Sequence, residues 1–279
     1  EYGQGVASEK IEYSHDLIAD EALRFVEEHA QQPFFLYFAL TPPHANNQAG
    51  DEGMEVPDLG IYADKDWPEA QKGTAALISL VDSDVGRLMT LLKEKGIDGN
   101  TLVFFTSDNG PHAEGGNDPD FFDSNGQLRG IKRDLYEGGI RVPMLVRWPG
   151  KAPAGSVSSH VGYFGDFMAT AAEVARIPAP PNLDSVSFLP AILGETDRQQ
   201  EHAYLYWEFY ERGSAQAIRM GNWKAVRKPM FGDKIELYNL ESDTGEEIDV
   251  AEGFPEVVTK ARQLMEEAHT SAPLWKIRD

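Results

Sequence analysis

TLVFFTSDNG, residues 101–110, joins a short apolar run that suits a buried strand to a polar turn. Apolar runs of this length, bounded by turn residues, are typical of strands that are covered on both faces of a sheet. An acid and an amide, Asp108 and Asn109, follow the run almost directly. Because ligands of open α/β sheets bind beyond the carboxyl ends of the strands, this position predicts a polar functional site.

Further apolar runs and two long amphipathic segments surround this stretch. FFLYFAL (34–40) and VPMLVRW (142–148) have the length and composition of strands. Residues 15–30 and 69–95 repeat apolar side chains at helical spacing, and Gly96 follows the second segment as a C-cap. Strands that alternate with long helices predict an α/β fold with a largely parallel sheet flanked by helices. The apolar face of the first helix would consist of Ile18, Ala22, Phe25 and Val26.

The pattern changes near residue 197. HAYLYWEFY, AIRMGNWKAVR and KIELYNL read as short strands that are separated by glycine-containing turns, and residues 256–272 read as one closing helix. We therefore predict two domains: an α/β domain over residues 1–197, and a smaller C-terminal α+β domain with antiparallel strands over residues 198–279.

The composition excludes several classes of function. Among 279 residues, 25 are basic and 46 are acidic, which gives a net charge of −21. Such a surface repels phosphate backbones and anionic lipids, which argues against nucleic-acid or membrane-surface binding. The chain has no cysteine, so it forms neither disulfides nor thiolate metal sites. No apolar run reaches the roughly 18 residues of a membrane span, and nothing indicates an oligomeric state.

The long glycine-rich loop after the strand, residues 107–141, contains most of the candidate site residues. Loops of this length inside compact domains are usually functional or disordered. Asp108 and Asn109 offer oxygen donors, which suit Ca²⁺ or Mg²⁺ rather than zinc; the alternative is an Asx turn that caps the strand. Lys132 can be a solvated surface lysine. His44 follows a Pro-Pro bend after the 34–40 run, and taken alone it is an ordinary loop histidine.

Several longer phrases resemble the formylglycine-dependent sulfatases, the arylsulfatase branch of the alkaline phosphatase superfamily. These phrases are PFFLYFALTPPHA, LVFFTSDNGPH, LRGIKRDLYEGGIRVPMLVRWPG, NWKAVR and ELYNLESDTGEE. The similarity runs from about residue 13 to about residue 250, so it covers most of the chain.

The resemblance implies roles for five residues. Asp108 and Asn109 correspond to two ligands of the active-site divalent cation, which is usually calcium in this family and less often magnesium. His44 corresponds to the histidine that hydrogen-bonds the sulfate ester near its leaving oxygen, and Lys132 to the lysine that holds a sulfate oxygen as a point charge. His112 is close enough in sequence to line the pocket as a substrate-binding residue. The substrate would be a sulfated small molecule or a sulfated glycan.

The chain also departs from the family pattern. The Cys/Ser-x-Pro-x-Arg motif that yields formylglycine is absent between Glu1 and Asp279, as are the early Asp-Asp pair and the Gly-Lys-x-His segment. All of these belong to the family's N-terminal portion. We therefore expect this chain to be the C-terminal part of a sulfatase, with the formylglycine outside it, and to be catalytically inactive alone. The resemblance further implies a periplasmic or secreted protein.

Two other interpretations stay open. A phosphate or phosphonate monoester hydrolase of the same superfamily would share the fold and the metal edge. A non-catalytic fragment, or a module that binds sulfated glycans without cleaving them, would explain the missing nucleophile motif.

Overall fold

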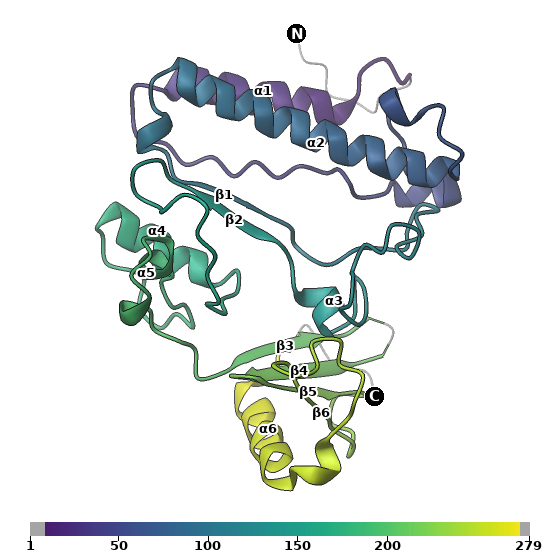
Figure 1. The fold of residues 1–279 in the computed structure, drawn as a ribbon, viewed down its shortest axis with the longest axis vertical. Helices are drawn as coiled ribbons and strands as arrows, with labels where there is room; N and C mark the ends of the chain where they lie inside the picture. The colour runs from purple at the N-terminus through teal and green to yellow at the C-terminus, as the bar shows by residue number, and fades with distance from the viewer. Residues whose placement is uncertain (1–8, 212, 274–279) are drawn as a thin grey trace. The chain divides into compact units, whose positions relative to one another are not determined.

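The computed structural model describes residues 9–211 and 213–273 (Figure 1). Contacts divide the chain into two compact units. The first unit contains the described residues up to Thr101 together with His112–Phe122. The second contains Leu102–Pro111 and the described residues from Asp123 onward. The domain boundary that the sequence places near residue 197 stays a prediction.

The described residues form α-helices, β-strands and short 3₁₀ helices. The α-helices are α1 (Ser14–His29), α2 (Glu69–Glu94), α3 (Glu137–Ile140), α4 (Asp166–Ala175), α5 (Leu189–Ile192) and α6 (Pro255–Ala268). The strands are β1 (Val103–Thr106), β2 (Met144–Arg147), β3 (Leu205–Phe209), β4 (Ala215–Met220), β5 (Trp223–Arg227) and β6 (Glu236–Asn239). Short 3₁₀ helices lie at Asn47–Glu52, Gly60–Tyr62, Asp98–Asn100, Thr196–Arg198 and Ala251–Gly253.

In the first unit, α1 and α2 lie side by side (Figure 1). Both helices match their predicted positions, and Gly96 has a φ of +71°, as a C-cap glycine requires. The predicted apolar face of α1 is partly wrong, because Ile18 is 39% exposed. The buried face consists of residues that are three or four positions apart, which one side of a helix presents. They are His15, Ala19, Ala22 and Val26.

A buried polar pair joins the two helices. His15 Nε2 lies 2.7 Å from Asp84 Oδ2, with almost no exposure of either side chain, and Arg87 Nη1 donates to Asp84 Oδ1 at 2.9 Å. The pair fixes how the helices are aligned, since each group would be costly to bury without a partner. None of the helices in the described part of the chain combines the length and apolar content that crossing a membrane requires.

Residues 34–40 do not form the predicted strand. Their exposure nevertheless alternates as in a strand: Phe35 and Tyr37 are 68% and 81% exposed, whereas Phe34, Leu36 and Phe38 are half-buried. A strand also needs a neighbouring strand, and the two sheets in the described ranges consist of β1-β2 and β3-β4-β5-β6, without residues 34–40. The apolar pattern therefore agrees with the alternating exposure, but it carries no information about pairing.

In the second unit, β1 and β2 form the strands predicted at 101–106 and 142–148. They pair antiparallel, with Val103 opposite Arg147 and Thr106 opposite Met144, so this pair does not supply the parallel pairing that we expected. The physical reason lies in their connection, because parallel neighbours require a crossover that is usually a long helix. Here the connection contains only the single helical turn α3. Phe104 of β1 packs edge-on against Phe167 of α4 and against Phe188.

The C-terminal residues form the predicted antiparallel sheet, in the order β3-β4-β5-β6, and α6 covers one of its faces (Figure 1). Alternate residues of the strands point to opposite faces, so Ile218 and Leu237 face α6 while Ala217 and Val226 face the other way. On that second face Leu135 from the long loop completes a separate apolar cluster. Trp207 of β3 also packs in this cluster.

Leu237 tests the cluster beneath α6. It is fully buried, so Leu237→Ala should lower the free energy of unfolding by about 2–5 kcal/mol through lost contacts and a residual cavity. Chemical denaturation measures the change. Ile248→Ala is the control, because Ile248 is 66% exposed and should change stability by no more than about 0.5 kcal/mol. Equal effects of the two substitutions would contradict the assignment of the core.

Candidate functional site

The turn after β1 presents the Asp108 side chain to solvent. Asp108 is exposed, and its carboxylate makes no hydrogen bond or ion pair within residues 9–211 and 213–273. Ser107 Oγ donates to the Asn109 carbonyl at 3.1 Å, and Asn109 Nδ2 donates to the Gly110 carbonyl at 2.8 Å. The Asx-turn alternative does not describe this arrangement, because an Asx turn needs the Asp108 carboxylate to accept a backbone N–H. Both the Asp108 carboxylate and Asn109 Oδ1 remain available as oxygen donors.

Gly110 holds this turn against α3. Its N–H donates to the Gly139 carbonyl at 3.0 Å. A β-carbon at residue 110 would lie 1.8 Å from the Gly138 carbonyl oxygen, which is far inside contact distance and involves backbone that cannot rotate away. Glycine is therefore required by close backbone approach. The constraint places the Asp108–Asn109 pair at a fixed position relative to α3.

Lys132 belongs to the same region of the second unit. Its backbone N–H donates to the carbonyl of Pro111 at 2.8 Å. The backbone of residue 132 is therefore hydrogen-bonded to a residue that lies three positions after Asp108. The Lys132 side chain is half-buried. The structure thus brings the segments of three candidate residues together: Asp108, Asn109 and Lys132.

The two candidate histidines meet in the first unit. The rings of His44 and His112 are stacked, with their centroids 5.8 Å apart. His44 Nδ1 donates to the Ala45 carbonyl at 2.8 Å, which leaves Nε2 facing Glu114 Oε2 at 3.6 Å. His112 Nε2 donates to the Pro43 carbonyl at 3.2 Å, and its Nδ1 accepts the Glu114 N–H at 3.1 Å. Backbone groups therefore fix the orientation of both rings.

Sequence reasoning missed Glu114. Its carboxylate is 14% exposed and is the acidic partner of His44. Only its spacing of two residues from His112 could have drawn notice, and a single loop glutamate carries no specific signal. The candidate residues are thus divided between the two units, and the convergence of His44 on Asp108, Asn109 and Lys132 stays a prediction.

The donor atoms suit a hard divalent cation, but they are few. Carboxylate and amide oxygens are the ligands that Ca²⁺ and Mg²⁺ prefer. No group of three or more histidine, aspartate or glutamate side chains in the described part of the chain is arranged to hold a metal ion. Asp108 and Asn109 can therefore supply part of a coordination shell, and a complete site needs further oxygen ligands.

Comparison with known proteins places the chain in a family. The family model described as "Sulfatase" matches residues 4–177, and the model described as "N-sulphoglucosamine sulphohydrolase, C-terminal" matches residues 130–271. The chain belongs to the sulfatase family.

Curated relatives support this assignment. N-acetylgalactosamine-6-sulfatase of Canis lupus familiaris is 36% identical over 74% of this chain and 36% of the relative. Steryl-sulfatase of Mus musculus is 33% identical over 77% of this chain and 32% of the relative. N-acetylgalactosamine-6-O-sulfatase of Bacteroides thetaiotaomicron is 28% identical over 91% of this chain and 51% of the relative. The chain therefore spans about a third to a half of the length of these relatives.

Solved structures confirm the predicted fold class, an α/β fold of the alkaline-phosphatase-like sulfatase type with a C-terminal antiparallel part. Ps i-CgsB in complex with k-i-k-neocarrahexaose matches 99% of this chain and 59% of its own length, with a TM-score of 0.79 and 30% identity. The phosphonate monoester hydrolase of Agrobacterium radiobacter matches 71% of this chain and 40% of its own length, with a TM-score of 0.54 and 23% identity. The second likeness concerns the fold alone.

Gly110→Ala tests the contact that positions the Asp108–Asn109 turn. The added methyl group meets the Gly138 carbonyl, so we expect a loss of about 1–3 kcal/mol in the free energy of unfolding, as for other overpacked sites. The control is Gly99→Ala, because a β-carbon there meets no atom within 4 Å and the backbone has no positive φ. That substitution should be neutral or stabilising. A neutral Gly110→Ala variant in urea denaturation would refute the contact.

Proposed function

We propose that this chain contributes part of the active site of a sulfuric ester hydrolase that cleaves a sulfate monoester. Membership of the sulfatase family supports the reaction class. The observation that carries the proposal for the site is the Asp108–Asn109 turn, whose oxygen donors have no protein partners among the described residues while the surrounding backbone is rigidly held. A pair of free oxygen donors at a fixed position suits a bound cation.

In this proposal Asp108 and Asn109 are ligands of Ca²⁺, with Mg²⁺ the less favoured ion. When bound, the cation supplies positive charge that stabilises the developing negative charge on the sulfate oxygens. Lys132 adds a second point charge on a sulfate oxygen. His44, oriented by the Ala45 carbonyl and facing Glu114, presents Nε2 as the ring atom that can hydrogen-bond the leaving oxygen. His112 lines the pocket beside it.

The nucleophile is proposed to lie outside this chain, since residues 1–279 contain no Cys/Ser-x-Pro-x-Arg motif. A formylglycine would supply the attacking hydrated aldehyde oxygen. Residues of this chain would then bind and orient the ester and balance its charge. A periplasmic or secreted location is part of the proposal and rests on family membership alone.

For the substrate we propose a sulfated sugar. Two curated relatives are named for sulfated N-acetylgalactosamine, and Ps i-CgsB was solved in complex with k-i-k-neocarrahexaose. A sulfated small molecule is the second possibility, because the murine relative is a steryl-sulfatase.

The alternative enzyme is a phosphate or phosphonate monoester hydrolase. The longer protein that carries the nucleophile should hydrolyse 4-nitrophenyl sulfate with a kcat/KM well above that for 4-nitrophenyl phosphate. A preference for the phosphate ester would favour the alternative. A complete natural protein that lacks any nucleophile motif, established by intact-mass measurement, would favour the non-catalytic glycan-binding interpretation.

Lys132→Ala tests the proposed sulfate contact in the longer protein. Removing a preorganised charge should lower kcat/KM for the sulfate ester by about 10²–10³-fold. Lys151→Ala is the control, because Lys151 is an exposed lysine in a turn and its loss should leave kcat/KM unchanged. Residues 1–279 alone should show no turnover; measurable turnover by a preparation of verified mass would contradict the placement of the nucleophile.

Asp108→Asn tests the metal ligand in the present chain. Calcium titration by calorimetry should show weak binding to the wild type, because two ligands form an incomplete shell, and at least about tenfold weaker binding to the variant, because a carboxylate is replaced by a neutral amide. Asp64→Asn removes the same charge from an exposed position elsewhere. If both variants weakened calcium binding equally, the effect would be that of net charge and Asp108 would not be a ligand.

A further inference from the structure

A charged cluster is buried where the long loop meets the C-terminal sheet. Lys224 lies on β5, and the alternation of strand residues puts it on the same face as Val226, opposite to α6. Its side chain is completely buried. Lysine is almost never fully buried unless it is paired, so its partners reveal what the cluster does.

Two carboxylates from distant parts of the sequence hold this ammonium group. Lys224 Nζ lies 3.0 Å from Glu137 Oε1 and 3.4 Å from Glu246 Oε1, and the side chains of both glutamates are at most 3% exposed. Glu246 Oε2 also accepts the Glu137 N–H at 2.6 Å. Burial raises the pKa of the Glu246 carboxyl, while the charge of Lys224 opposes the change. The first residue of α3 is thus bound through both its side chain and its backbone.

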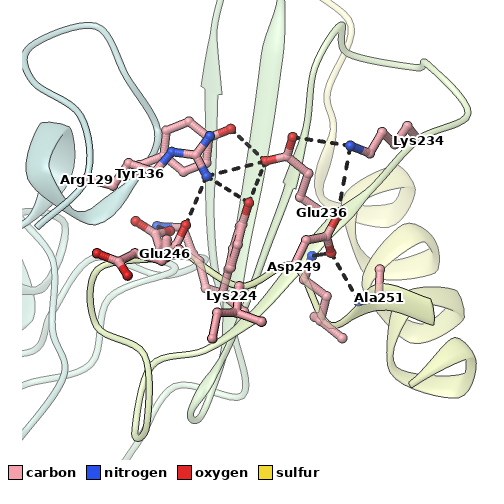
Figure 2. A network of polar contacts seen from close by, with 12 residues as sticks. Arg129, Tyr136, Lys224, Lys234, Glu236, Glu246, Asp249 and Ala251 are labelled. Atoms are coloured by element: carbon pink, nitrogen blue, oxygen red, sulfur yellow. Dashed lines mark hydrogen bonds and ion pairs between the residues drawn. The ribbon is translucent and has the colours of Figure 1, made fainter. Parts of the chain in front are cut away.

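A second set of contacts holds the start of the same loop segment. Arg129 Nη1 donates to the Tyr238 hydroxyl at 2.8 Å and to the Glu246 carbonyl at 3.0 Å. Its guanidinium lies 3.8 Å from the ring centroid of Tyr136. Figure 2 shows Arg129 lying between Tyr136 and the Glu246 segment, with Glu236 beside it. Both ends of residues 129–137 are therefore attached to the C-terminal sheet and to the turn after it.

From this cluster a short chain of backbone contacts leads to the candidate metal ligands. Glu137 is followed by Gly138, whose N–H donates to the Arg129 carbonyl at 2.7 Å, and by Gly139, whose carbonyl accepts the Gly110 N–H at 3.0 Å. Gly110 follows Asn109 directly. The Lys132 N–H is bonded to the Pro111 carbonyl one residue further on. A displacement of α3 would therefore move the turn that carries Asp108 and Asn109.

We infer that Lys224, Glu137 and Glu246 are positioning residues, which set the Asp108–Asn109 turn and Lys132 through α3 without contacting the substrate. The inference deepens the proposed function and rests on it for the roles of these three site residues. The C-terminal sheet is then part of the active-site scaffold. Neither family membership nor the sequence pattern assigns such a role to the buried lysine.

Amide hydrogen exchange of the whole chain, resolved to single residues by NMR, tests the inference directly. Glu137→Gln is the main variant, because it removes the charge that attaches α3 to Lys224, while the N–H of residue 137 stays bonded to Glu246 and Lys224 stays paired with Glu246. Arg219 and Arg141 near Glu137 are partly exposed and remain hydrated. The amides of Gly110 and Lys132 should exchange at least about tenfold faster, while those of Ile218 and Ala225 in β4 and β5 change by less than about twofold.

Two further variants, a stronger perturbation and a matched control, complete the test. Lys224→Met leaves both carboxylates without their ammonium and should have a larger effect in the same direction; if it does not fold, Glu137→Gln still decides. Glu247→Gln is the matched control, because Glu247 is the exposed neighbour of Glu246 and should leave every amide unchanged.

Three outcomes for Glu137→Gln overturn the inference: unchanged exchange at Gly110 and Lys132, faster exchange confined to residues 136–141, or equal acceleration throughout β4 and β5. The last would mean that the cluster only stabilises the unit. Exchange does not depend on metal or activity, so it separates the two proposals. If the wild type binds no calcium but Gly110 and Lys132 respond as expected, the metal assignment fails and the positioning stands.

Discussion

The second unit depends on a backbone contact that leaves no room for a side chain, between Gly110 and the Gly138–Gly139 pair. Residues 107–137 connect the end of β1 to α3. The contact of Gly110 fixes the position of α3, at the end of this connection, relative to the turn after β1. It holds the turn while the Asp108 carboxylate stays exposed and without a protein partner in the described ranges. Rigid backbone beneath an unused carboxylate is the arrangement that a ligand-binding position requires.

The net charge of the chain makes local electrostatics decisive for the proposed reaction. With an excess of 21 negative charges, the surface as a whole repels a sulfate ester. Binding therefore requires that the field be inverted within one small region, which a divalent cation on Asp108 and Asn109 together with Lys132 would accomplish. In the proposed site a cation would therefore contribute more than in a basic protein, because the charge of Lys132 would otherwise act against the net negative charge of the chain.

Helix and strand positions that follow from residue periodicity were predicted from the sequence. Features that depend on contacts between distant residues were missed. Helical spacing located α2, strand composition located β1, and Gly96 marked a helix end, all as observed. Residues 34–40 showed the alternation of a strand, yet pairing cannot be deduced from alternation. Asp108 and Asn109 were singled out by their place after the strand and by their oxygen donors, whereas the roles of these two residues and of Lys132 came from the resemblance and stay predictions. Lys224 was missed because a lone lysine in a strand is read as solvated, and its partners lie 87 and 22 residues away.

The ion pairs around Lys224 add little to the free energy of unfolding, so a role other than stabilisation has to account for them. Buried ion pairs gain little over apolar side chains of similar volume, because desolvation offsets their attraction. Breaking such a pair is a different matter, since an uncompensated buried charge costs about 3–5 kcal/mol. A shift of α3 by one residue would place Tyr136 or Gly138 opposite Lys224 and leave the ammonium group with Glu246 alone. An apolar cluster would tolerate the same shift with only a modest change in packing. Charged groups therefore specify the position of a segment more sharply than they stabilise the fold. In the proposed site, a loop that delivers Asp108, Asn109 and Lys132 to fixed places would need precise positioning more than added stability.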